Sequence, residues 1–77
     1  MNIKILGPGC RNCKKLEKNT QEAIDELGID ASIEKIEDFK DIASYGVMKT
    51  PGLVVNEEVK AYGKVSSVKE IKKILVD

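Results

Sequence analysis

The sequence predicts a small α/β domain whose elements follow the order β-α-β-α-β-β-α. Apolar residues recur at helical spacing from Cys10 to Leu27 and from Val68 to Leu75, which is typical of helices that pack one face against a core. The other apolar runs are short and are bounded by glycine, proline and polar residues, as strands are. A chain of 77 residues is near the lower size limit for a stable core, so we expect residues 1–77 to form a single domain.

The first strand and helix are predicted on either side of a glycine-rich turn. Ile3–Leu6 is apolar but too short for a helix, and the helix is expected to run from Cys10 to Leu27. Gly28 is expected to end this helix in the left-handed conformation. The inward face of the helix comprises Cys13, Leu16, Thr20, Ala23, Ile24 and Leu27.

A second strand and a short helix are predicted next. Apolar residues alternate from Ile29 to Ile33, which predicts a strand over about Ala31–Ile36. Asp38 can cap a short helix that ends at Gly46. That helix contains Phe39, Ile42 and Ala43.

A hairpin and a last helix complete the chain. Leu53–Val55 and Glu58–Tyr62 are the predicted strands of the hairpin, with Asn56 and Glu57 at the turn. Because Glu57 stands where tight two-residue turns favour glycine, we expect a looser turn. Ser67 and Glu70 form a capping box at the start of the helix. The helix has an apolar stripe of Val68, Ile71, Ile74 and Leu75.

The charge balance argues against several classes of partner. Thirteen basic and thirteen acidic residues cancel and are mixed along the chain, so no basic block predicts a nucleic-acid or anionic-membrane site. No apolar run approaches the length of a transmembrane helix. Met1 leads almost directly into the first strand, so we expect no signal peptide and a cytoplasmic location. There, a close cysteine pair is more often catalytic or metal-binding than structural.

Both cysteines of the chain, Cys10 and Cys13, lie at the predicted helix start, where a spacing of three places them on one side. The helix dipole, free backbone N–H groups and nearby basic residues favour the thiolate of Cys10, the attacking species in disulfide exchange. Cys13 lies on the apolar stripe and should be more buried. This asymmetry predicts a redox-active pair in which Cys10 attacks a substrate disulfide and Cys13 resolves the mixed disulfide.

Two other uses of the pair remain open from the residues alone. A structural disulfide would close too small a loop to restrict the unfolded chain much. Two thiolates are half of a tetrahedral zinc site, and the chain has no histidine, so zinc would require a dimer with four cysteines. Copper(I) can be held by two thiolates, which leaves a copper or zinc metallochaperone as an alternative.

Three features together resemble the thioredoxin/glutaredoxin superfamily, in particular its small archaeal and bacterial redox-active disulfide proteins. They are the strand-loop-CxxC-helix opening, Thr50-Pro51 ahead of a hairpin, and the closing amphipathic helix. The resemblance implies a thioredoxin fold, with a four-stranded mixed sheet flanked by three helices. It also implies a cis Thr50–Pro51 bond that faces the cysteines, with Thr50 and Pro51 as the substrate-binding platform. Heavy-metal-associated domains are less similar, because they have methionine where Pro8 stands and end in a strand.

The implied activity is that of a thiol–disulfide oxidoreductase in electron transport and cell redox homeostasis. We expect protein disulfide substrates, an upstream reductase or thiol pool, a monomer, no metal, and no bound cofactor because the dithiol carries the electrons. Use of glutathione or another small thiol, as in glutaredoxins, is an alternative. The glutaredoxin Gly-Gly and Asp are absent after Tyr62; Ser66 and Ser67 can bind a carboxylate there or simply cap the helix.

Four residues at three sites depart from thioredoxin. Gly9 replaces the tryptophan before the cysteines, and Arg11-Asn12 replaces the Gly-Pro between them, so neither the contact surface nor the reduction potential can be transferred. Lys4 falls where thioredoxin has a buried acid that acts on the second cysteine. We expect Lys4 to extend to an acid such as Glu34, with tuning of Cys13 as the alternative.

Overall fold

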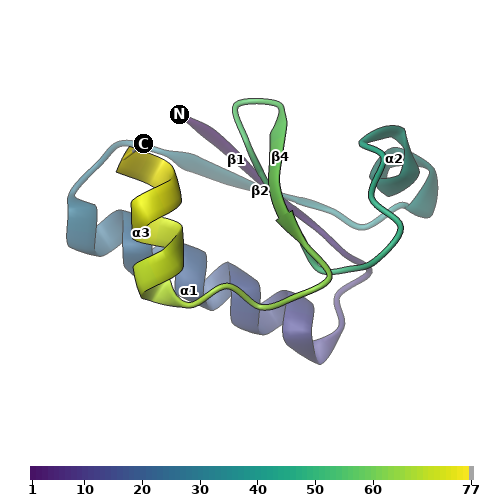
Figure 1. Ribbon diagram of the computed structural model, residues 1–77, viewed down its shortest axis with the longest axis horizontal. Helices are drawn as coiled ribbons and strands as arrows, with labels where there is room; N and C mark the ends of the chain where they lie inside the picture. The colour runs from purple at the N-terminus through teal and green to yellow at the C-terminus, as the bar shows by residue number, and fades with distance from the viewer. Residues whose placement is uncertain (77) are drawn as a thin grey trace.

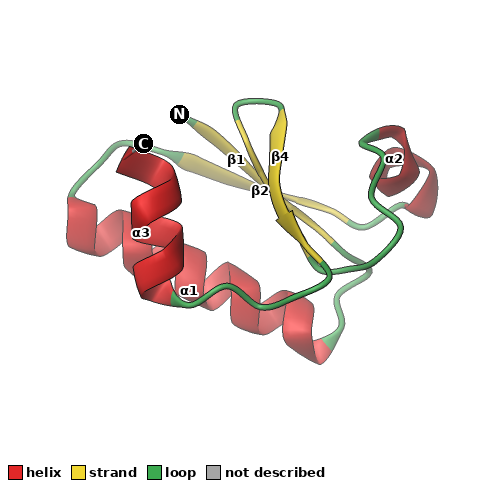
Figure 2. Ribbon diagram, viewed as in Figure 1, coloured by secondary structure: helices red, strands yellow, loops and turns green. Residues whose placement is uncertain are grey.

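A four-stranded mixed sheet in the order β2-β1-β3-β4 forms the centre of the structure, a computed structural model that describes residues 1–76 (Figure 1). The strands are β1 (Asn2–Leu6), β2 (Ser32–Ile36), β3 (Gly52–Val55) and β4 (Glu58–Tyr62). The helices are α1 (Arg11–Leu27), α2 (Phe39–Ser44) and α3 (Val68–Val76) (Figure 2). β1 pairs parallel with β2 and antiparallel with β3, and β3 pairs antiparallel with β4. The predicted element order and mixed sheet are confirmed.

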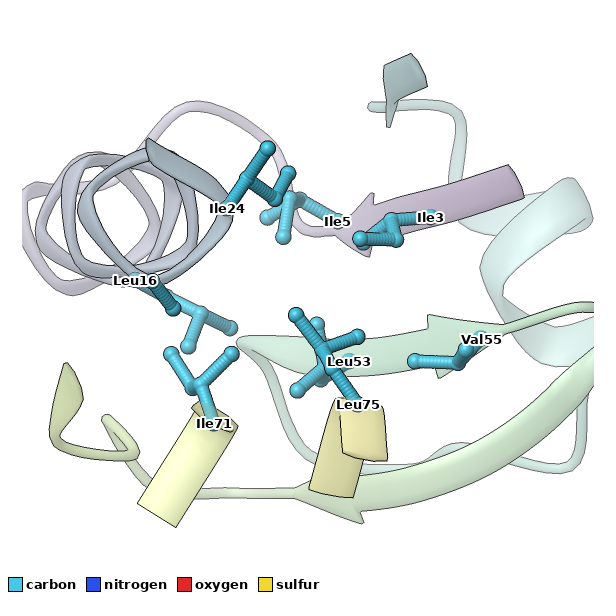
Figure 3. Packing of buried hydrophobic residues seen from close by; sticks show 9 residues of the cluster. Ile3, Ile5, Leu16, Ile24, Leu53, Val55, Ile71 and Leu75 are labelled. Atoms are coloured by element: carbon cyan, nitrogen blue, oxygen red, sulfur yellow. The ribbon is translucent and has the colours of Figure 1, made fainter. Parts of the chain in front are cut away.

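Side chains alternate between the two faces of the sheet along each strand, and the helices cover these two faces unequally. α1 and α3 lie against one face, and α2 lies against the other (Figure 1). Figure 3 shows the larger cluster, in which side chains of β1 and β3 meet those of α1 and α3. Its labelled members are Ile3, Ile5, Leu16, Ile24, Leu53, Val55, Ile71 and Leu75. The smaller cluster, under α2, consists of Leu6, Ile42, Val47 and Val54.

α2 and α3 begin with the predicted caps, whereas α1 begins at Arg11, one residue later than expected. Cys10 is the N-cap of α1, and Gly28 ends that helix with a φ of 65°. The Asp38 carboxylate accepts a hydrogen bond from the Lys40 N–H at the start of α2. At α3, the Glu70 N–H donates to the Ser67 hydroxyl at 3.2 Å and the Ser67 N–H donates to the Glu70 carboxylate at 3.1 Å. The antiparallel pairing of Leu6 with Gly52 places the loop before α1 and the loop before β3 at one end of the sheet.

The hairpin turn differs from the prediction of a looser connection. Val55 pairs with Glu58, so the turn has only two residues, Asn56 and Glu57, with φ angles of 50° and 68°. Asn56 is held by β1, since its backbone N–H donates to the Asn2 carbonyl at 2.7 Å and its side-chain oxygen accepts from the Asn2 N–H at 3.0 Å. Contacts to the turn therefore compensate for the missing glycine.

Lys4 pairs with Glu57 and not with Glu34, the expected acid. Its ammonium lies 2.6 Å from the Glu57 carboxylate and donates to the Tyr45 hydroxyl at 2.8 Å. These hydrogen bonds raise the pKa of Lys4 and, from the other side, lower the pKa of Glu57. Lys4 alternates with Ile3 and Ile5, which pack toward α1, so its side chain leaves the sheet on the α2 face. This placement separates Lys4 from Cys13 and argues against the alternative role in tuning Cys13.

None of the three described helices has the length and apolar character needed to cross a bilayer.

Candidate active site

Cys10 and Cys13 meet at the first turn of α1, where they form a disulfide with 5.0 Å between their Cα atoms. Cys10 is the N-cap, in an extended backbone conformation, and its side chain is exposed to solvent. Cys13 lies one turn into the helix and is only 5% exposed, against the sheet. The predicted asymmetry between an accessible and a buried sulfur is present.

The surroundings of Cys10 favour negative charge on its sulfur. The Cys13 backbone N–H donates to the Cys10 sulfur at 3.2 Å, and the first turn of α1 contains no acidic residue. Arg11, Lys14 and Lys15 are exposed on the same turns. The positive end of the helix dipole adds to this field. A reduced Cys10 is therefore placed to react as a thiolate.

Gly7 makes the close approach of Cys13 to the β1–α1 loop possible. A Cβ atom built on Gly7 would overlap the Cys13 sulfur and would lie 3.8 Å from the Thr50 Cβ. Gly7 thus lies between the redox pair and the segment that enters β3. From the sequence alone, Gly7 is only part of the predicted turn. A glycine directly after a buried strand and before the CxxC motif is the signal that indicates this close contact.

Thr50 and Pro51 lie beside the redox pair, and their peptide bond is cis, as the resemblance implies. In Figure 1 the segment entering β3 lies next to the loop that connects β1 to α1. Pro51 is buried, and its carbonyl accepts a hydrogen bond from the Gly63 N–H at 2.9 Å. Within residues 1–76, no hydrogen bond to the Thr50 backbone is present. All four predicted site residues are therefore at one end of the molecule.

A cavity of about 300 Å³ opens next to Cys13 and is lined by charged groups that were not among the predicted site residues. Glu17 and Lys35 form an ion pair of 3.3 Å across it, from α1 and β2. Glu37, after β2, also lines it. The i, i+4 spacing of Cys13 and Glu17 was a usable signal, whereas Lys35 and Glu37 reach the cavity only through the β1–β2 pairing.

The segment before α3 has the capping role that was one of its two predicted uses. The Glu70 carboxylate occupies the helix start and also contacts the Lys64 ammonium at 3.0 Å. Hydrogen bonds from Lys64 and from Ser67 lower the pKa of Glu70. The Ser66 hydroxyl is buried and has no hydrogen-bond partner among the residues that the structure describes. A carboxylate already at this helix end disfavours binding of a second one.

The two cysteine sulfurs are the candidate metal ligands at this site. Within the described chain, no group of three or more histidine, cysteine, aspartate or glutamate side chains converges. Two thiolates alone do not complete a zinc site.

Comparison with known proteins assigns the family. A family model described as a thioredoxin domain matches residues 1–76. The chain belongs to this thioredoxin family. It is similar to the thioredoxin of Methanothermobacter thermautotrophicus, with 53% identity over 75 residues that cover 97% of both chains. It is also similar to the thioredoxin of Methanocaldococcus jannaschii, with 42% identity over 73 residues, 95% of this chain and 84% of that protein.

Family membership and the paired cysteines together establish the general activity. The protein is a thiol–disulfide oxidoreductase. Its family implies protein substrates and a reductase partner that restores the dithiol. The metallochaperone and the glutathione-dependent alternatives are not favoured by these findings.

Proposed function

We propose that the protein reduces disulfides in other proteins, with Cys10 as the nucleophile and Cys13 as the resolving thiol. The Cys10 thiolate attacks one substrate sulfur, and the other substrate sulfur leaves with the electron pair. Cys13 then attacks the Cys10 sulfur, which releases the second substrate thiolate and leaves Cys10 and Cys13 oxidised. The observation that carries this assignment is the contrast between exposed, N-capping Cys10 and Cys13, which is 5% exposed.

Thr50 and Pro51 form the platform for the substrate backbone in this proposal. The free backbone groups of Thr50 support pairing with an extended substrate segment. The anchoring of Pro51 through Gly63, at 2.9 Å, supports a fixed platform. Gly7 keeps this platform close to the cysteines.

An apolar cavity beside Thr50 supports protein substrates over small thiols. It has a volume of about 260 Å³ and is lined by Phe39, Ile42, Ala43, Val47, Met48 and Thr50. Phe39 and Met48 are 68% and 89% exposed, so together with the cavity they offer apolar surface that a protein substrate can cover. This surface compensates in part for the tryptophan that Gly9 replaces.

We also propose how the oxidised pair is reduced again, where the protein is located and its oligomeric state. A reductase or a thiol pool returns the oxidised pair to the dithiol, and no further cofactor is needed because two sulfurs carry two electrons. We place the protein in the cytoplasm as a single-domain monomer of residues 1–77. Sedimentation of the reduced and oxidised protein tests the monomeric state.

Single-cysteine variants test the assignment of the two sulfurs. Cys10→Ser is expected to reduce insulin disulfides no faster than the solution without protein. Cys13→Ser is expected to accumulate a mixed disulfide between Cys10 and the substrate, visible by mass spectrometry and released by added dithiol. Accumulation of the mixed disulfide on Cys13 in Cys10→Ser would reverse the assignment, and full activity of both variants would refute it.

A further inference from the structure

The buried position of Cys13 raises the question of which group takes its proton. Cys13 must lose the proton from its thiol before it can attack the Cys10 sulfur, since the thiolate is the nucleophile. Its sulfur is shielded by the sheet and by Gly7. Burial disfavours the charged form of a thiol. Resolution of the mixed disulfide therefore needs a proton acceptor close to Cys13.

The cavity next to Cys13 is lined by two lysines, Lys14 and Lys35, and by two carboxylates, Glu17 and Glu37, which are the candidate proton acceptors. Glu17 is four residues after Cys13 on α1, so the two side chains are neighbours on one helix face. Helical side chains lean toward the N-terminus of their helix, which directs Glu17 back over the turn that carries Cys13. Glu37 lies at the other side of the cavity, where its carboxylate is 3.3 Å from the position of a Cβ on Gly9. Geometry thus favours Glu17 over Glu37.

Two further observations suit Glu17 to exchange protons. Its side chain is 34% exposed and is held by Lys35 at 3.3 Å across the cavity, so it is positioned but keeps contact with solvent. Glu17 also lines a second hollow, together with Lys18, Gln21 and Ile33. It therefore stands between the cavity at Cys13 and the outer surface, where a proton can be passed on.

We propose that Glu17 is the proton acceptor for Cys13 in the resolving step. The Cys13 thiol gives its proton to the Glu17 carboxylate as the Cys13 sulfur bonds to the Cys10 sulfur. The bond between Cys10 and the substrate sulfur breaks, and its electron pair leaves on the substrate thiolate. The Glu17 carboxyl then returns the proton to that thiolate or to solvent. The inference rests on the proposed roles of Cys10 and Cys13.

A single-turnover reaction with a chromogenic aromatic disulfide, dithionitrobenzoate, separates the two steps. With reduced protein in excess, attack by Cys10 releases one coloured thionitrobenzoate, and attack by Cys13 releases the second. In Glu17→Gln the first release is expected to keep its rate. The second is expected to slow about 100-fold or more at neutral pH, because general acid–base catalysis typically contributes about 10²- to 10⁴-fold.

The pH profile distinguishes proton transfer from a change of structure. Without the carboxylate, the rate of the second release is expected to rise in proportion to hydroxide concentration, and the gap to the wild type should close at alkaline pH. Added imidazole should accelerate the second release in Glu17→Gln more than in the wild type. Glu17→Asp should recover part of the rate.

Glu22→Gln is the matched control, because Glu22 is an exposed glutamate on the same helix outside the cavity. This variant should match the wild type in the rates of both releases.

Other outcomes overturn the assignment to Glu17. They are an unchanged second release in Glu17→Gln, equal slowing of both releases, slowing that persists unchanged at alkaline pH, or slowing in Glu37→Gln alone. If the proposed roles of Cys10 and Cys13 are wrong, the results differ from these. In that case Cys10→Ser would keep the first release, or the first release would disappear in Cys13→Ser, whatever residue stands at position 17.

Discussion

Glu57 adopts a left-handed backbone conformation, with a φ of 68°, and its carboxylate contacts the Lys4 ammonium at 2.6 Å. The left-handed region is unfavourable for residues with a Cβ atom. The ion pair, and the hydroxyl of Tyr45 at 3.3 Å from the same carboxylate, offset this cost. One side chain thus links the hairpin turn to β1 and to the end of α2.

Replacing Glu57 by Gln should make the stability of the protein less sensitive to acid. Lys4 lowers the pKa of Glu57 in the folded state, so this carboxylate stabilises the fold above the pKa of an unfolded glutamate, about 4.3. The stabilisation is lost as the pH falls from there through the folded pKa. Denaturant unfolding measured from neutral to acid pH should therefore show a smaller loss for Glu57→Gln, and the two curves should converge in acid. Glu22→Gln should run parallel to the wild type, and a parallel curve for Glu57→Gln would contradict the prediction.

At the scale of residues, the sequence allowed prediction of roles that depend on near neighbours. The exposure of Cys10 and the burial of Cys13 follow from a helix start and a stripe of apolar residues. The partner of Lys4 could not be predicted, because the turn that carries Glu57 is distant in the sequence and its tightness depends on contacts with Asn2. For the same reason, Lys35 and Glu37 were not among the predicted site residues.

Helices and strands depend mainly on short-range signals, and their limits were therefore predictable. Asp38 and Ser67 cap α2 and α3 through hydrogen bonds that span two or three residues. Gly28 and Gly46 follow α1 and α2 with φ angles of 65° and 78°. The helix ends matter for function, because the first turn of α1 presents Cys10 and the segment after α2 leads to Thr50.

Removing the Ser67 hydroxyl should destabilise the protein through α3. Ser67→Ala leaves the Glu70 N–H without its side-chain acceptor, present at 3.2 Å in the structure. Loss of such a cap costs about 0.5–2 kcal/mol of unfolding free energy. Urea unfolding measures this loss, and Ser32→Ala, at an exposed serine that starts β2, is the matched control. Equal stabilities of Ser67→Ala and Ser32→Ala would contradict the proposed importance of the cap.

At the scale of the molecule, strand order was the property least accessible from the residues. Periodicity predicted four strands and three helices, and the family resemblance implied a mixed sheet, but neither specified the order β2-β1-β3-β4. Pairings between distant segments depend on how helices pack across a sheet, and the local pattern does not encode them. The same packing brings Thr50 to Cys13 and Glu17 to Lys35.

The two faces of the sheet differ in the number of apolar residues buried against them. The cluster under α1 and α3 has nine buried residues, whereas the cluster under α2 has four, so α2 is held by much less apolar contact. Units with few buried contacts open locally at lower free energy than the whole protein. The α2 face also carries Phe39, Met48 and the segment that leads to Thr50. Its local opening would therefore move the proposed substrate surface and leave the cysteine-bearing helix in place.

Native-state hydrogen exchange should detect this independent opening. The Ile42 amide donates to the Asp38 carbonyl at 3.0 Å and the Gly46 amide donates to the Ala43 carbonyl at 2.8 Å, at the two ends of α2. Both amides should exchange at a lower free energy than amides of β1 and β3. Ile24→Ala should weaken protection of the strands by about 2–5 kcal/mol and leave α2 unchanged, because the contacts of Ile24 survive the opening of α2. Ile42→Ala should weaken protection in both places, because it destabilises the native state relative to both opened forms. If Ile24→Ala instead weakens protection in α2 and in the strands together, the two faces unfold as one unit, and the α2 surface cannot move independently of the redox pair.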